Sequence, residues 1–294
     1  MRYTLRQLQI FRTVAETLSY TAAAGRLHLT QPAVFGQVRQ LEAQLGQALI
    51  ERLGRRLHLT EAGERAARGA ASVLAAVERL DAEMAELKGL GGGRLHLAVV
   101  STAKYMLPRL LGPFSAAHPG LDIRLTVGNR RELLERFSAN LDDLYVLGAL
   151  PDGLAAHSRP LAENPLIVIA PPDHPLAAVR KIDLATLAAE PFVMREPGSG
   201  TRRAAEQAFA AAGLAPRVRL ELGANEAVKQ AVMAGLGLSV LSQGTVQLEI
   251  DHGYLVALDV AGFPLRRTWS IAWHRGKRLS RAAQAFLDSL PAAA

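Results

Sequence analysis

Cysteine is absent from this 294-residue chain, which excludes disulfide bonds and thiolate chemistry but does not fix a compartment. No apolar run approaches the length needed to cross a membrane, although 49% of the residues are hydrophobic. Residues 1–5 lack the charged and apolar regions of a secretory signal. A chain of this size can bury a substantial core. We therefore expect a cytoplasmic protein without a membrane partner.

Motifs typical of enzymes are also missing. The eight histidines are dispersed and show no metal-ligand spacing, so the sequence predicts no metal site. Gly198-Ser199-Gly200 has Pro197 where a nucleophile elbow needs its first glycine, and it completes neither a dinucleotide fingerprint nor a Walker A loop. We expect no catalytic residues and no cofactor. The alternatives are an enzyme, which substrate turnover would reveal, and a stand-alone solute-binding protein.

The segment from Leu18 to Leu45 has the pattern of two short helices joined by a tight turn. The first helix spans residues 21–27, and the second opens at Thr30, a good N-cap, with Pro32 in its first turn. Apolar residues at three- and four-residue spacing predict the buried stripe of the second helix: Val34, Val38, Leu41 and Leu45. This spacing indicates a helix-turn-helix, and an ordinary helical hairpin is the alternative.

Polar side chains on the other faces of the second helix have the chemistry needed to read DNA. Glutamine pairs with adenine edges, and arginine pairs with guanine or phosphate. Residues 1–60 contain eight arginines against three glutamates, which favours a polyanionic partner. Residues 48–52 and 55–60 predict two short strands around Gly54, a basic wing. The candidate DNA-contacting residues are Thr30, Gln31, Pro32, Phe35, Gln37, Arg39, Gln40, Arg52, Arg55 and Arg56.

A long helical pattern follows over residues 61–90. Its apolar residues alternate four and three apart, which favours a coiled coil, and packing on its own domain is the alternative. The predicted dimerisation residues are Val73, Val77, Leu80, Met84 and Leu87. A glycine-rich hinge over 91–93 then marks the clearest domain boundary. Dimerisation suits a DNA reader that contacts two half-sites.

Beyond the hinge, apolar runs alternate with helical patterns, which predicts a doubly wound α/β architecture. The expected strands are residues 95–100, 123–127, 144–147, 166–170, 192–194 and 236–241. About two hundred residues favour two subdomains with a cleft between them: one of residues 94–163 and 266–294, and one of residues 164–265. Ligands in such folds bind where strands end and helices begin.

Small polar residues gather at several of these predicted junctions. Hydroxyls and free backbone donors at helix N-termini favour an anion, whereas ordinary caps or turns are the alternative at each motif taken alone. The candidate effector-binding residues are Ser101, Thr102, Lys104, Asn129, Arg195, Gly198, Ser199, Gly200, Thr201, Arg202, Asn225 and Glu226.

The phrases LRQLQIFRTVAE, TAAAGRLHLTQPAV and LIERLGRRLHLTEAG resemble the DNA-binding domain of LysR-type transcriptional regulators. The phrases VVSTAKYMLPRLL, REPGSGTR and ELGANEAVKQAVMAGLGLSVLS resemble the subgroup that regulates RuBisCO and other Calvin-cycle operons. The resemblance implies an α plus α/β chain: an N-terminal winged helix-turn-helix over residues 1–60, a long dimerisation linker helix, and a C-terminal periplasmic-binding-protein-like effector domain of two α/β subdomains over residues 94–294.

The resemblance also implies function and partners. It implies an activator of carbon-fixation operons that binds double-stranded promoter DNA, works with RNA polymerase and forms a homodimer and a homotetramer. Its effector would be a phosphorylated sugar or NADPH, acting allosterically. A LysR-type regulator of another metabolic operon, with a different anionic effector, is the alternative.

Two departures from the family pattern bear on these expectations. Phe35, followed by Gly36, stands where the family commonly has a small polar residue, so base or phosphate contacts are expected to differ. In the strand near residue 145, Asp142 replaces an apolar residue, Tyr145 a small one and Ala149 an arginine. The lost cation and the added ring are expected to alter the choice of effector.

Overall fold

The computed structural model describes residues 3–54, 56–87 and 93–291. The chain divides into two compact units that meet in sequence near residue 90. None of the helices in the described residues is both long and apolar enough to cross a membrane.

Three short helices build the core of the first unit: α1 (Leu5–Thr17), α2 (Tyr20–Leu27) and α3 (Gln31–Leu45). Thr4 and Gln7 form a capping box that starts α1. Ala23 and Ala24 of α2 are buried, and their small side chains allow α1 and α3 to approach. The predicted helix-turn-helix is therefore confirmed.

The turn and the packing of α3 follow the predicted pattern with two exceptions. Thr30 is the N-cap residue, but its side chain makes no cap hydrogen bond. Val34, Val38 and Leu41 are completely buried, whereas Leu45 is 38% exposed. Leu45 is the last residue of α3 and lies beyond the part of the helix that packs on α1 and α2.

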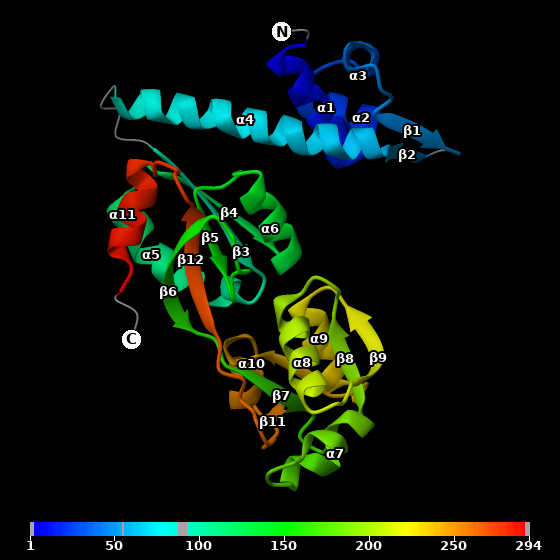
Figure 1. Ribbon diagram of the computed structural model, residues 1–294, viewed down its shortest axis with the longest axis vertical. Coiled ribbons are helices and arrows are strands. Elements are labelled where there is room, and N and C mark those ends of the chain that lie inside the picture. The colour runs from blue at the N-terminus through cyan, green and yellow to red at the C-terminus, as the bar shows by residue number, and fades with distance from the viewer. Residues whose placement is uncertain (1–2, 55, 88–92, 292–294) are drawn as a thin grey trace. The chain divides into compact units, whose positions relative to one another are not determined.

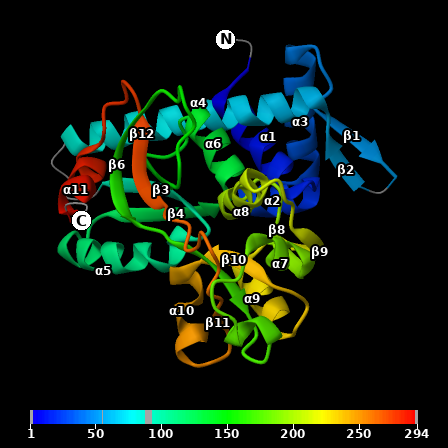
Figure 2. The same ribbon diagram turned by 60° about the horizontal axis from the view of Figure 1, so that its bottom comes forward.

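A two-stranded hairpin follows α3 and projects beyond the helices (Figure 2). Strands β1 (Ile50–Leu53) and β2 (Arg56–Leu59) pair antiparallel. Gly54 takes the positive φ of 63° that the tight turn requires. The buried carboxylate of Glu42 accepts hydrogen bonds from the backbone amides of Leu49 and Ile50, at 2.8 and 3.1 Å, and so ties the hairpin to α3.

The longest helix of the chain is α4 (Glu61–Leu87, Figure 1). Its first turns pack on α1 through Ala66, Ala70 and Leu74. Farther along, Val73, Leu80 and Met84 are exposed. The side chain of Leu87 and residues 91–92 of the predicted hinge lie outside what the structure describes.

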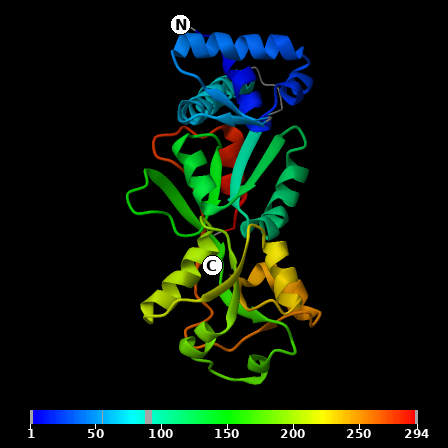
Figure 3. The ribbon, with the colours of Figure 1, turned by 90° about the vertical axis from the view of Figure 1, so that its right-hand side faces the viewer.

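The first lobe of the second unit is a five-stranded sheet in the order β4-β3-β5-β12-β6 (Figure 3). Helices α5 and α11 cover one face, and α6 covers the other. The strands are β3 (Arg94–Val100), β4 (Asp122–Gly128), β5 (Leu144–Leu147), β6 (Ala156–Glu163) and β12 (Thr268–His274). The helices are η1 (Ala103–Tyr105), α5 (Leu107–Ala117), α6 (Arg130–Ser138) and α11 (Arg281–Ser289).

The second lobe has two small sheets, β10-β7-β11 and β8-β9, linked by a bridge between Phe192 and Leu238. Helices α7 and α8 cover one face, and α9 and α10 the other. The strands are β7 (Leu166–Ala170), β8 (Pro191–Arg195), β9 (Arg217–Leu222), β10 (Ser239–Ser242) and β11 (Val256–Ala257). The helices are η2 (Pro175–Ala178), α7 (Leu184–Ala189), α8 (Gly200–Ala211), α9 (Asn225–Met233) and α10 (Gln243–Asp251).

Two crossing segments join the lobes: residues 164–165 between β6 and β7, and the chain that returns into β12. They run antiparallel and are hydrogen-bonded, with Asn164 N to Arg267 O at 2.7 Å and Leu166 N to Leu265 O at 3.0 Å. The predicted α/β alternation is confirmed, and each expected strand overlaps an observed one. Strands β6, β9, β11 and β12 were not predicted.

Candidate functional site

The first unit presents a polar surface along α3. Gln31, Phe35 and Arg39 are exposed and lie four residues apart on one face of the helix, and Gln40 is exposed beside them. Thr30 and Pro32 are exposed, and Gln37 is half-buried. The helix runs through Gly36 without a break. The three buried residues of the core stripe lie on another side of α3, so the helix has a core face and a face open to a partner.

The wing adds positive charge to the same unit. Arg52 and Arg56 are exposed, and Arg52 Nε donates to the Gly54 carbonyl at 3.1 Å. Arg55 lies outside the described residues. Neither Arg52 nor Arg56 is paired with a carboxylate in the part of the chain that the structure describes, so both are available to phosphates.

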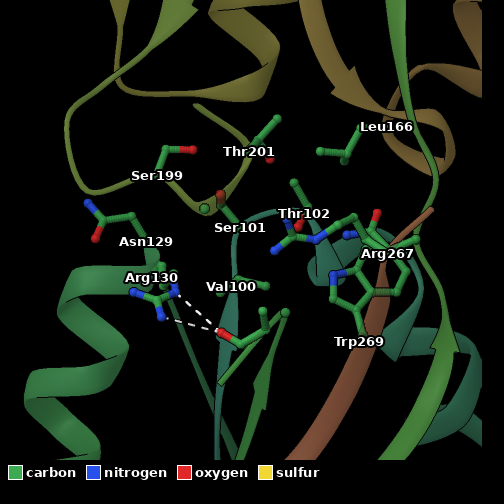
Figure 4. Close-up of a pocket in the computed structure, with 14 residues that line it drawn as sticks. Val100, Ser101, Thr102, Asn129, Arg130, Leu166, Ser199, Thr201, Arg267 and Trp269 are labelled. Atoms are coloured by element: carbon green, nitrogen blue, oxygen red, sulfur yellow. Dashed lines mark hydrogen bonds between the residues drawn. The ribbon is translucent and has the colours of Figure 1, made fainter. Parts of the chain in front are cut away.

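The second unit contains a cavity of about 490 Å³, counting its open mouth, between its two lobes. Strand ends of the first lobe supply Val100, Ser101, Thr102 and Asn129. The second lobe supplies Ser199, Gly200 and Thr201 from the start of α8. The crossing segments supply Asn164 and Arg267, and the adjoining strands β7 and β12 supply Leu166 and Trp269 (Figure 4). Six of the predicted effector residues thus line one cavity: Ser101, Thr102, Asn129, Ser199, Gly200 and Thr201.

The hydroxyls and amides of the wall differ in what they already bind. Asn129 caps α6, because its Oδ1 accepts from Glu132 N at 3.0 Å. Ser199 caps α8 and accepts from Arg202 N at 3.4 Å. The side chains of Thr102 and Thr201 are buried, and neither has a hydrogen-bond partner among the described residues. These two hydroxyls are free to bind a ligand.

Arg130 and Arg267 give the cavity its charge, and the sequence-based site did not include them. They approach from opposite sides in Figure 4, with Ser101 and Thr102 between them. Arg130 donates twice to the Ala149 carbonyl, both at 3.4 Å. Burial, together with the nearby charges of Arg203 and Arg267, lowers the pKa of Arg130. No acidic side chain is found among the described residues that line the cavity, so the wall carries uncompensated positive charge.

Trp269 closes the cavity from β12. Its indole is 4% exposed, and its Nε1–H is a buried donor without an acceptor among the described residues. A buried donor left unsatisfied costs about 1–3 kcal/mol.

The other predicted effector residues do not line the cavity, which corrects the sequence-based site. Arg195 is buried and bound by the Glu196 carboxylate at 2.7 and 2.9 Å, by Asn225 Oδ1 and by Ser101 Oγ at 3.2 Å. Arg202 is bound by Glu206 at 2.7 Å and by Glu221. These guanidinium groups are occupied by carboxylates that the fold brings to them. Gly198, whose positive φ of 98° shapes the turn before α8, also lies outside the lining.

Lys104, Tyr105 and Glu226 form a bridge beside the cavity. Lys104 Nζ lies 2.9 Å from Glu226 Oε1, and Tyr105 O–H donates to the same oxygen. Lys104 and Tyr105 belong to the first lobe, and Glu226 begins α9 of the second. Partial burial opposes the charge of Glu226, but the hydrogen bonds from Tyr105 and Lys104 outweigh it and lower its pKa to about 2. Burial raises the pKa of Tyr105, and the hydrogen bond to the charged Glu226 raises this pKa further.

Only one of the three departures near residue 145 reaches the cavity. Ala149 lines it, and its carbonyl binds Arg130. Tyr145 is completely buried against Phe137, and its O–H donates to the Arg136 carbonyl at 3.0 Å. Asp142 is buried and paired with Arg136 at 2.7 Å. The added ring therefore belongs to the core and does not line the cavity, and its effect on the choice of effector stays a prediction.

Two family profiles match the chain. Residues 5–64 match the profile described as "Bacterial regulatory helix-turn-helix protein, lysR family", and residues 88–294 match "LysR substrate binding domain". Among curated proteins, the RuBisCO operon transcriptional regulator of Allochromatium vinosum is 48% identical over 288 residues, which is 98% of this chain and 95% of the relative.

Two solved structures resemble the chain. The Synechocystis CcmR regulatory domain in complex with 2-PG has a TM-score of 0.65 at 47% identity and covers 67% of this chain and 94% of its own. Full-length CbnR complexed with its target DNA has a TM-score of 0.70 at 25% identity and covers 98% of both chains.

Proposed function

The chain belongs to the LysR family of transcriptional regulators, and on that premise we propose that it controls a RuBisCO or related carbon-fixation operon in response to a small phosphorylated metabolite. The operon is proposed from the curated relatives, because the A. vinosum relative aligns over nearly the full length of both chains. A LysR-type regulator of another operon with a different anionic effector is the second candidate.

The first unit binds promoter DNA through α3 and the wing. CbnR, which resembles the whole chain, is solved on its target DNA. In this chain, Gln31 and Arg39 on α3 contact base edges in the major groove, and Arg52, Arg55 and Arg56 contact phosphates. Thr30, Pro32, Phe35, Gln37 and Gln40 complete the surface. The exposed polar face opposite the buried stripe supports this assignment.

The cavity of the second unit binds the effector. The observation that carries this proposal is the pair of arginines, Arg130 and Arg267, on a wall without carboxylates. Arginine binds phosphate through paired, charge-assisted hydrogen bonds. The related CcmR regulatory domain in complex with 2-PG supports a small phosphorylated ligand. A sugar phosphate or NADPH is the alternative.

The effector acts by selecting one arrangement of the two lobes. Because Arg130 lies in the first lobe and Arg267 in the crossing segment, an anion bound to both favours the arrangement in which they are close. A ligand shifts such an equilibrium only by its differential affinity for the two states. The protein then acts as a homodimer or homotetramer, changes the contacts of its DNA-binding units, and works with RNA polymerase at the promoter in the cytoplasm.

Fluorescence anisotropy tests the proposal on the full-length protein. Labelled promoter DNA from upstream of its own gene and a scrambled duplex are titrated at one fixed salt concentration, since phosphate contacts make affinity salt-dependent. We expect tighter binding to the promoter, and a shift of that binding when 2-PG, ribulose 1,5-bisphosphate or NADPH is added.

Arg267→Ala assigns the effector response to the cavity. A hydrogen bond to a charged group contributes about 1.5–3 kcal/mol, so we expect the half-maximal effector concentration to rise by about 10- to 150-fold. Arg180→Ala is the control, because Arg180 is an exposed arginine of the same unit, outside the cavity. Equal affinity for promoter and scrambled DNA would overturn the regulatory proposal, and an unchanged effector response in Arg267→Ala would overturn the cavity assignment.

A further inference from the structure

Phe35 is an exposed aromatic residue on α3 that the fold does not need for its core. Its ring is 40% exposed, whereas its neighbours Val34 and Val38 are completely buried. It is absent from the apolar cluster that holds α1, α2 and α3 together. It lies between Gln31 and Arg39, four residues from each, in one exposed row along the helix.

The ring of Phe35 is held in a fixed orientation. It packs edge-on against Tyr20, with 5.3 Å between the ring centroids and 76° between the planes. The guanidinium of Arg39 lies 5.4 Å from the Phe35 centroid and also contacts Glu42 at 3.2 Å. Glu42 is in turn fixed by the two backbone amides of the wing. Phe35 is therefore presented to the outside as a preorganised apolar surface beside a positioned cation.

An apolar ring can read only one feature in the major groove. The side chain of Phe35 has no hydrogen-bond donor or acceptor, so it cannot distinguish the bases by their hydrogen-bonding groups. The 5-methyl group of thymine is the apolar feature of the groove, and phenylalanine is one of the side chains that contact it. The residue in this position of α3 thus changes the kind of information that the helix reads.

We propose that Phe35 reads the 5-methyl group of a thymine in each operator half-site, next to the base or phosphate that Arg39 contacts. The proposal rests on the proposed function, because it requires α3 to enter the major groove of a specific promoter sequence. It adds a specificity determinant of stated chemistry: a methyl contact where a small polar side chain would make a hydrogen bond.

Replacing thymine by deoxyuridine tests the contact, because it removes the methyl group and leaves base pairing intact. Each thymine of the protected promoter site is replaced in turn, and the dissociation constant of the full-length protein is measured by anisotropy. At one thymine per half-site we expect affinity to fall about fourfold, which corresponds to the roughly 0.8 kcal/mol of one buried methyl-sized group.

Variants at residue 35 assign the methyl contact to this side chain. Phe35→Ala should bind the thymine and deoxyuridine operators equally at that position, and Phe35→Leu should keep the discrimination. Leu45→Ala is the control, because Leu45 is an exposed apolar residue at the far end of the same helix. This variant should distinguish thymine from deoxyuridine as the unmodified protein does. Circular dichroism confirms that each variant is folded.

The outcomes separate this inference from the proposed function. Specific promoter binding that is insensitive to every deoxyuridine substitution would overturn the methyl contact and leave the regulator intact. Discrimination that survives in Phe35→Ala would assign the contact to another side chain and overturn the inference. Failure to distinguish the promoter from scrambled DNA would overturn both.

Discussion

The carboxylate of Glu226 connects the two lobes of the second unit through a hydrogen bond and an ion pair. Its Oε1 accepts from Tyr105 of the first lobe and lies 2.9 Å from Lys104 Nζ. Lys229, one turn along α9, has its Nζ 5.4 Å from the centroid of the Tyr105 ring and 2.7 Å from Glu249 Oε1. The bridge holds the lobes beside the cavity, and its strength depends on the negative charge of Glu226.

We predict that Glu226→Gln lowers stability in a pH-dependent way. The folded state lowers the pKa of Glu226 from 4.5 to about 2, so the ionised carboxylate stabilises the fold fully above pH 4.5, and this contribution disappears as the pH falls through 2. Urea midpoints should therefore be lower for Glu226→Gln than for the unmodified protein at pH 7, with a smaller gap at pH 3.5. Glu135→Gln is the control, because Glu135 is an exposed glutamate on α6, and its urea midpoint should equal that of the unmodified protein at both pH values. A Glu226→Gln midpoint that is lower by the same amount at pH 7 and pH 3.5 would contradict the prediction.

For single side chains, the sequence predicts where a residue lies better than it predicts whether the side chain is free to bind a ligand. Ser101, Thr102 and Asn129 follow predicted strands and line the cavity. Arg195 and Arg202 were predicted beside them, but residues as far as 94 positions away in sequence bind their guanidinium groups. Arg130 directly follows the predicted Asn129, so its position was a usable signal. Arg267 carried no signal, because it enters the cavity from an unpredicted crossing segment.

Among the elements, α4 carries an apolar stripe that changes its role along its length. Ala66 and Ala70 pack within the first unit, so the alternative of packing on its own domain holds for these early turns. Val73, Leu80 and Met84 are 44, 55 and 44% exposed, with Val77 half-buried between them. Four apolar residues at alternating four- and three-residue spacing form a seam that a second copy of the helix can cover.

We predict that Leu80→Asp breaks the dimer. Two copies of the residue face each other across a parallel or antiparallel seam near its centre, and a buried unpaired charge costs several kcal/mol. The dimer dissociation constant should rise by at least about 100-fold, as measured by sedimentation velocity over a concentration series. Asp81→Lys changes the charge one residue along but off the seam and should leave the dimer intact; a dimer that persists in Leu80→Asp would refute the seam.

Helices and strands with a clear local pattern of apolar residues were predictable. Strands that depend on pairing with strands far away in sequence were not. Helix α3 and the buried strand β7 (Leu166–Ala170) have local patterns that fix their type, and the structure matches both. Strand β12 pairs with β5 and β6, more than a hundred residues earlier in the chain. Its alternation of Trp269, Ile271 and Trp273 with smaller residues was missed, and with it the cavity wall that holds Trp269.

The whole molecule combines a helix-turn-helix unit and a unit with an arginine-lined cavity in one chain. In the proposed function, the arginine pair makes the second unit responsive to a phosphorylated ligand, and the predicted seam of α4 brings two DNA-binding units together. Coupling between them requires that the effector favour one arrangement of the lobes over another. The account therefore predicts that the effector changes which promoter bases the bound protein protects.

The most direct test is a nuclease footprint of the full-length protein on its promoter, with and without saturating 2-PG. The account predicts that the ligand shortens, lengthens or shifts the protected region or its hypersensitive positions, and that Arg267→Ala loses this change while keeping the ligand-free footprint. A footprint that is identical with and without each of 2-PG, ribulose 1,5-bisphosphate and NADPH, all at saturating concentration, would contradict the account.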